Sequence, residues 1–79
     1  MLYLDASALG KRYADEPGSD AIHSRFNSRE KIFTSVLSYA EIQAALGRKF
    51  REQKINKAHL AEIRERFTLE AVSKLSIVH

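Results

Sequence analysis

The stretch "LYLDASAL", residues 2–9, decides the fold, because within it a strand pattern gives way to a helix pattern. Leu2 and Leu4 bracket Tyr3, which predicts a short and largely buried β-strand. Asp5 follows where that strand would leave the sheet, and Ser7 is placed to cap the helix that the next residues predict. A carboxylate at this position either caps a turn or is held out for chemistry. The rest of the sequence bears on that choice.

Composition limits the classes of protein to which the chain can belong. Its 79 residues allow one small domain, and the net charge is +3. The absence of cysteine excludes disulfides and thiolate metal sites. No apolar run has the length of a membrane span, and the N-terminus lacks the basic and apolar parts of a signal peptide. We therefore expect a soluble cytoplasmic protein.

Three strand-like stretches alternate with pairs of helix-like stretches. Strands are predicted near residues 2–4, 31–36 and 74–79, and helices over residues 7–16, 20–27, 37–53 and 57–67. Strands separated by helical crossovers predict an α/β fold with a parallel sheet. We therefore expect about three parallel strands and about four helices. The exposed edges of so small a sheet predict self-association into a homo-oligomer.

The helix predicted over residues 37–53 carries the clearest signals. Ser38 and Glu41 form an S-x-x-E capping box at its start. The apolar residues at helical spacing should face the core: Tyr39, Ile42, Leu46 and Phe50. Asn56 is expected to cap the next helix, whose buried face should carry Leu60, Ile63 and Phe67.

Positive charge is concentrated at the end of the predicted helix 37–53 and in the turn after it. Five basic residues lie there against the single acid Glu52: Arg48, Lys49, Arg51, Lys54 and Lys57. A basic stripe of this kind either binds phosphates or is the solvated face of a helix. Lys11 and Arg12 form a second basic pair that could guide a phosphate, and nothing in the sequence selects among these residues.

Asp5 and Glu41 follow two strands that are predicted to be parallel. Because ligands bind at the carboxyl ends of parallel strands, both side chains should lie at the same edge of the sheet. Two carboxylates there could hold Mg²⁺ or Mn²⁺, with Ser7 supporting the site through a hydrogen bond. Each residue also has a purely structural alternative: Asp5 as a turn cap, Glu41 in the capping box, and Ser7 as an N-cap.

Two segments carry a resemblance to a known family. "LYLDASALGKRYADEPGSDAI" and "FTSVLSYAEIQAALGR" together resemble the N-terminal part of PIN-domain ribonucleases of the VapC toxin type. Such proteins open with a strand ending in D-x-S/T-A-L, continue to an E-P-G-S turn, and carry T-S-x-L-S-x-x-E after the second strand. The resemblance runs over most of the chain, most clearly from Leu2 to Arg48. It implies a partial PIN-like, three-layer α/β fold over residues 1–79.

The resemblance also implies an activity. Proteins of this type are metal-dependent endoribonucleases, each the toxin of a toxin–antitoxin pair, so RNA is the implied substrate and an antitoxin protein the implied partner. The family pattern makes Asp5 and Glu41 the metal-binding and catalytic acids, with Ser7 as the supporting hydroxyl. It also supplies one or two further aspartates beyond the third strand, and the sequence reaches His79 before any of them. We therefore expect a truncated domain with a weak or incomplete Mg²⁺ or Mn²⁺ site.

The remaining titratable residues offer no second site, and two other classes of function stay open. His23, His59 and His79 have no metal-ligand spacing, and Glu70 is expected to be solvated. A non-catalytic module that retains a dimer or antitoxin-binding surface is the main alternative to a nuclease. A fragment that binds RNA through the basic stripe alone is the third possibility.

Overall fold

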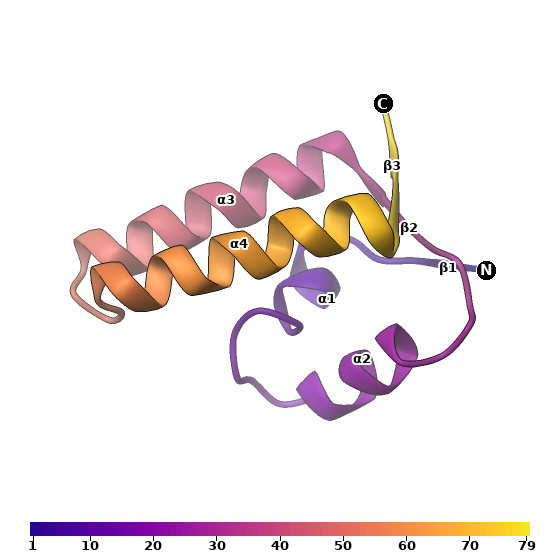
Figure 1. The fold of residues 1–79 in the computed structure, drawn as a ribbon, viewed down its shortest axis with the longest axis horizontal. Helices are drawn as coiled ribbons and strands as arrows, with labels where there is room; N and C mark the ends of the chain where they lie inside the picture. The colour runs from indigo at the N-terminus through magenta and orange to yellow at the C-terminus, as the bar shows by residue number, and fades with distance from the viewer.

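The computed structural model describes residues 1–79, and its elements alternate as the sequence predicts. They are β1 (Leu2–Tyr3), α1 (Ala6–Gly10), α2 (Ser19–Phe26), β2 (Ile32–Ser35), α3 (Val36–Arg51), α4 (Lys57–Ser73) and β3 (Leu75–Val78). The sheet has the order β1-β2-β3, and both strand pairs are parallel. The predicted α/β class, with three parallel strands and four helices, is confirmed (Figure 1).

The strands alternate between a buried and an exposed face. Ile32 pairs with Leu2 on one side and with Leu75 on the other, and this row of side chains faces the helices. The next row faces the opposite way, and there Tyr3 is 57% exposed. The prediction that the first strand is largely buried is therefore wrong at Tyr3, because the side chains of successive strand residues alternate between faces and nothing covers the outer one.

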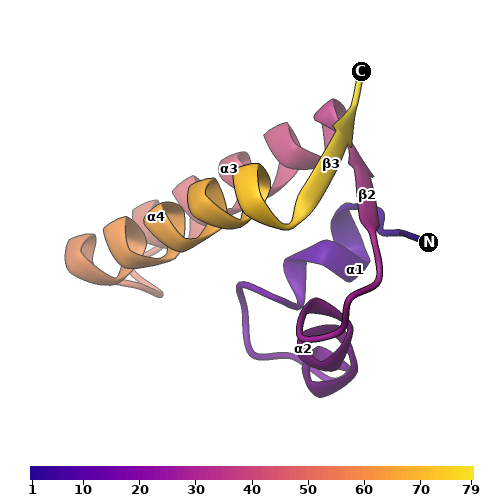
Figure 2. The same ribbon diagram turned by 45° about the vertical axis from the view of Figure 1, so that its right-hand side comes forward.

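All four helices lie on one side of the strands (Figures 1 and 2). Residues 1–79 therefore form two of the three layers that the resemblance implies, and the outer face of the sheet is bare. Parallel sheets are normally covered on both faces, so this bare face is unusual. None of the helices has the length and apolar character needed to cross a membrane.

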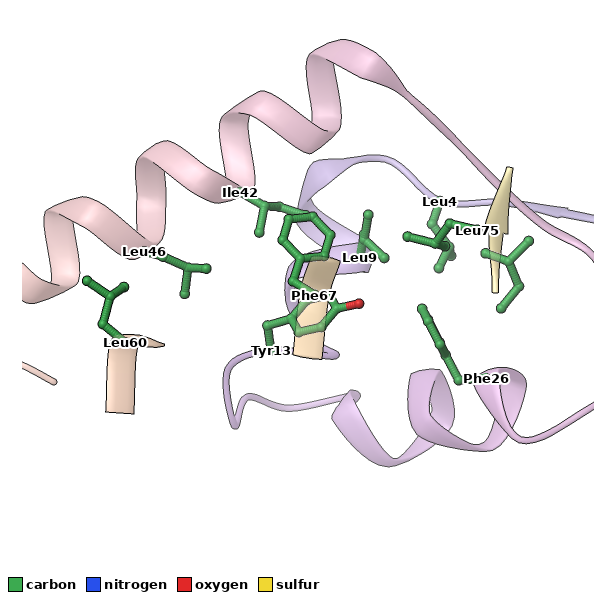
Figure 3. Close-up of a cluster of buried hydrophobic side chains, with 10 residues drawn as sticks. Leu4, Leu9, Tyr13, Phe26, Ile42, Leu46, Leu60, Phe67 and Leu75 are labelled. Atoms are coloured by element: carbon green, nitrogen blue, oxygen red, sulfur yellow. The ribbon is translucent and has the colours of Figure 1, made fainter. Parts of the chain in front are cut away.

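The core lies between the sheet and the helices, and Figure 3 shows its side chains gathered there. Its buried apolar residues are Leu4, Leu9, Tyr13, Phe26, Ile32, Ile42, Leu46, Leu60, Phe67 and Leu75. Phe67 is fully buried, and its ring centroid lies 4.5 Å from that of Tyr13 and 4.6 Å from that of Tyr39. The predicted core position of Phe50 is wrong: it is 38% exposed, because it lies in the last turn of α3, beyond the residues that bury Ile42 and Leu46.

The helix starts differ from two of the predictions. Asp5, rather than Ser7, caps α1, because its carboxylate accepts a hydrogen bond from the Ala8 N–H. Ser35, rather than Ser38, caps α3, because its hydroxyl oxygen accepts a hydrogen bond of 3.0 Å from the Ser38 N–H. The Ser38–Glu41 capping box is therefore wrong, since α3 begins directly after β2 and the hydroxyl at the strand end is used first. The predicted cap of α4 by Asn56 is confirmed.

The first helix is also shorter than predicted. Regular α-helix ends at Gly10, and the chain continues with tighter hydrogen bonds from Lys11, Arg12 and Tyr13 back to the third residue before each. These turns bring Tyr13 into the core. The second helix, α2, begins at Ser19 after Gly18, whose φ of 94° is readily adopted by glycine.

Candidate active site

The carboxyl ends of β1 and β2 are joined by a buried hydrogen bond. The Thr34 hydroxyl donates to the Leu4 carbonyl at 2.8 Å, and the Leu4 N–H donates to the carbonyl of Phe33 at the same distance. Asp5 follows the first of these strand ends and Ser35 the second. The starts of α1 and α3 are therefore held at one edge of the sheet, as parallel strand order requires.

Asp5 is exposed at this edge, and only one of its carboxylate oxygens has a protein partner. That oxygen, Oδ1, accepts from the Ala8 N–H at 2.9 Å. The other oxygen, Oδ2, forms no hydrogen bond or ion pair within the chain. The capping role is therefore real, and it leaves one oxygen of Asp5 open to a ligand.

A groove of about 300 Å³ runs between α1, with the turns after it, and α3. Its lining defines the α1–α3 groove: Ala6, Ser7, Gly10, Tyr13, Ala14, Glu16, Glu41, Ile42, Ala45, Leu46, Arg48 and Lys49. Small residues form part of this lining, among them Gly10 and Ala45. Ser7 and Glu41 thus share one groove, while Asp5 lies outside its lining, two residues before Ser7 along the chain.

The Glu41 carboxylate is exposed and has no hydrogen-bond or ion-pair partner in the protein. The sequence offered the capping box as a structural reason for this glutamate. Because Ser35 makes the cap, that reason does not apply. An unpartnered carboxylate in a groove is available to a metal ion or a substrate.

Glu16 is a third acid at the site that the sequence did not single out. The buried Ser19 hydroxyl accepts from the Glu16 N–H at 2.9 Å and donates to the Ala14 carbonyl at 3.0 Å. These two bonds hold the turn so that Glu16 lines the α1–α3 groove. The sequence feature that could have indicated Glu16 is the E-P-G-S segment. It predicts a turn, but it does not predict that the glutamate lines a groove.

Arg12 is used inside the fold rather than on its surface. Its guanidinium forms two hydrogen bonds with the Glu70 carboxylate, at 3.1 and 2.5 Å, and the Tyr13 hydroxyl donates to Glu70 at 2.8 Å. Arg12 also lies 2.8 Å from the Nδ1 of His23 and 4.6 Å from the centre of the Phe26 ring. The predictions that Arg12 is a phosphate guide and that Glu70 is solvated are therefore wrong.

Charge and burial in this cluster shift two pKa values. Burial alone would raise the pKa of Glu70, but the hydrogen bonds from Arg12 and Tyr13 and the nearby charges of Arg12 and Arg66 bring it below its usual value. Burial, together with the bond to Glu70, raises the pKa of the Tyr13 hydroxyl. Glu70 is therefore an anion at neutral pH, and Tyr13 is its protonated donor.

The carboxylates at the site suit a metal ion that keeps several water ligands, rather than one coordinated by protein side chains alone. No group of three or more histidine, aspartate or glutamate side chains is close enough to enclose a metal ion. Mg²⁺ commonly takes only one or two carboxylates and completes its shell with waters and a substrate phosphate. The oxygens of Asp5 and Glu41 fit that chemistry. The histidines are not part of it, and His23 instead contacts Arg12.

The family model of the PIN domain matches residues 2–79. The chain belongs to the PIN domain family. No curated protein and no solved structure matches the sequence. Membership indicates a nuclease-like function on RNA, and PIN domains generally depend on divalent metal ions. The open groove, lined by the Glu16 and Glu41 side chains, is compatible with both properties.

Proposed function

We propose that this PIN domain is a VapC-type endoribonuclease, the toxin of a toxin–antitoxin pair, whose activity requires Mg²⁺ or Mn²⁺. The observation that carries the proposal is the Glu41 carboxylate, which lines the α1–α3 groove beside Ser7 and has no structural partner. We further propose that residues 1–79 are a truncated form of the domain, because the parallel sheet is bare on one face.

Asp5 and Glu41 would hold the metal ion through carboxylate oxygens. When bound, such an ion supplies an activated water and offsets charge on the phosphate oxygens. The bond from Ala8 fixes the Asp5 side chain, so its second oxygen is oriented before any ligand arrives. Ser7 is placed to donate its hydroxyl proton to a carboxylate or to a phosphate oxygen, which would orient either group.

Cleavage of a labelled single-stranded RNA with Mn²⁺ or Mg²⁺ tests this function. The assay compares the wild type with Asp5→Asn and Glu41→Gln, and with wild type in EDTA. Glu62→Gln is the matched control, because Glu62 is exposed on α4 and lies outside the α1–α3 groove. Cutting should vanish in both site variants and in EDTA, and should persist in the control. Cutting that survives in Asp5→Asn or in EDTA would contradict the proposal.

A second candidate function, self-association without catalysis, has support from the bare face of the sheet. Exposed apolar side chains of β1, β3 and the first turn of α3 line one hollow at this face: Tyr3, Val78, Val36 and Leu37. The accessible surface is 5367 Å², against about 4,900 Å² expected for a compact monomer of 9.0 kDa. This excess agrees with an uncovered apolar face, which a second copy of the chain or an antitoxin would bury.

Sedimentation equilibrium of the wild type and of Leu37→Glu separates these functions. A dimer that dissociates in Leu37→Glu and has no metal-dependent cleavage would support the interaction module alone. Leu37 is 66% exposed, so the substitution should not disturb the core. A monodisperse monomer would contradict self-association, and it would leave the nuclease to be judged by the cleavage assay.

A further inference from the structure

The α1–α3 groove has charged residues of both signs along one face of α3. Glu41, Ala45, Arg48 and Lys49 all line it, at the spacings that place residues on the same side of a helix. Arg48 is seven residues after Glu41, which is two helical turns, or about 10 Å along the axis. The part of α3 that lines the groove therefore begins with an acid and ends with two bases.

Arg48 and Lys49 are the only basic residues that line this groove, and neither forms an ion pair. Several other basic residues already have partners in the protein. Arg12, Arg25 and Lys54 form ion pairs with carboxylates, and Arg64 donates a hydrogen bond to Gln43. Arg51, Lys54 and Lys57 line a separate hollow at the turn between α3 and α4. The structure thus selects two members of the basic stripe that the sequence could not separate.

The size of the groove limits what the side chains of Arg48 and Lys49 can bind. Its volume of about 300 Å³ is at the lower end of the range for small-ligand pockets. Such a space takes one strand of nucleic acid rather than a paired helix, and RNA enzymes and binding modules commonly act on unpaired segments. Arg48 and Lys49 have no carboxylate partner in this groove, and the partner expected for them is a backbone phosphate.

We propose that Arg48 and Lys49 bind a phosphate of single-stranded RNA two helical turns from Glu41. The inference rests on the proposed function, because RNA is its ligand. Held there, the strand extends along α3 with a different phosphodiester beside Glu41 and Ser7. Arg48 and Lys49 are positioning residues, since they contact the strand away from the bond that is cut. Their loss should raise KM more than it lowers kcat.

Fluorescence anisotropy of a labelled, unstructured oligoribonucleotide tests the proposal in EDTA, where metal-dependent cleavage is absent. The test variant is Arg48→Gln with Lys49→Gln, and the control is Arg51→Gln with Lys57→Gln. Both change the net charge by two, and glutamine is a good helix former at these positions. Thermal unfolding followed by circular dichroism checks that both variants are folded.

The test variant should lose about 5-fold in affinity at 0.1 M salt, from a salt slope of about 0.7 for the one phosphate that the two side chains neutralise. The slope of log affinity against log salt should fall by about 0.7, and the control should change much less. Equal losses in the two variants would mean that affinity follows net charge, which would overturn the proposal. Unchanged affinity in the test variant would overturn it too.

These outcomes can be separated from failure of the proposed function. If the wild type cuts RNA but the test variant binds as tightly as the wild type, the phosphate site is wrong and the nuclease stands. If binding behaves as proposed while no variant or wild-type protein cuts RNA, the phosphate site stands and the nuclease does not.

Discussion

The Thr34 hydroxyl donates a hydrogen bond of 2.8 Å to the Leu4 carbonyl, and both residues are buried, with Thr34 at 0% and Leu4 at 4% exposure. The bond joins the ends of two parallel strands directly before Asp5 and Ser35. It therefore sets where α1 and α3 begin, and through them where the carboxylates of the site lie.

Thr34→Val should destabilise the fold by about 1–3 kcal/mol, because it keeps the shape of the side chain and removes the buried hydrogen bond to Leu4. Urea unfolding measures the change. Thr68→Val is the control, since Thr68 is exposed on α4 and the same chemical change there should have little effect. A variant as stable as wild type would show that this bond does not hold the strand ends together.

Asp5→Asn separates the structural role of Asp5 from its proposed metal role. Asparagine caps helices about as well as aspartate, so the free energy of unfolding should change little. Asp5→Ala should instead lose about 1 kcal/mol with the cap. Metal affinity, measured by Mn²⁺ titration, should fall in both variants. Affinity that stays at the wild-type level in Asp5→Asn would leave Asp5 as a cap alone.

Glu70→Gln should destabilise the protein at neutral pH by roughly 2–4 kcal/mol, because it leaves the mostly buried Arg12 guanidinium without its anion. The pKa of Glu70 is lowered in the folded state from 4.5, so its charge stabilises the fold above that pH. This contribution is lost as the pH falls through the folded-state pKa.

Urea unfolding of wild type and Glu70→Gln between pH 7 and pH 3 measures that dependence. The difference in unfolding free energy should be largest near neutral pH and should shrink below pH 4.5. Glu65→Gln, an exposed neighbour on α4, provides the control and should follow the wild type at every pH. A difference that does not vary with pH would rule out the Glu70 charge as its source.

Ala45→Leu should block the α1–α3 groove without changing its charge. The larger side chain occupies space between the acidic and basic ends, so affinity for single-stranded RNA should fall while Mn²⁺ affinity is kept. Ala44→Leu is the matched control, because Ala44 is exposed and outside the groove lining. Equal RNA affinities in the two variants would indicate that RNA does not enter the groove.

The sequence was sufficient to predict the element order, the parallel sheet and the cap of α4, because these depend on local periodicity and on single capping residues. It was not sufficient to predict the cap of α3, which is Ser35 and not the predicted Ser38. The segment T-S-V-L-S carries three hydroxyls, and the one that caps the helix depends on where β2 ends, which is set by pairing with β1 and β3.

Contacts between distant residues account for most of what the sequence could not predict at the site. Arg12 and Glu70 are 58 residues apart, so no local pattern indicates that they pair. The direction of Glu16 depends on two hydrogen bonds of Ser19 within a turn. The packing of α1 against α3 determines which basic residues share the groove with Glu41.

The Mn²⁺ affinity of Glu41→Gln, compared with that of Glu62→Gln by isothermal titration calorimetry, tests the central claim most directly. Glu41 is a carboxylate without a structural partner, so its loss should leave the fold intact and weaken metal binding at least about 10-fold. Glu62→Gln should bind as the wild type does. Equal affinities in the two variants, or no Mn²⁺ binding by the wild type, would contradict the assignment of Glu41 as a metal ligand.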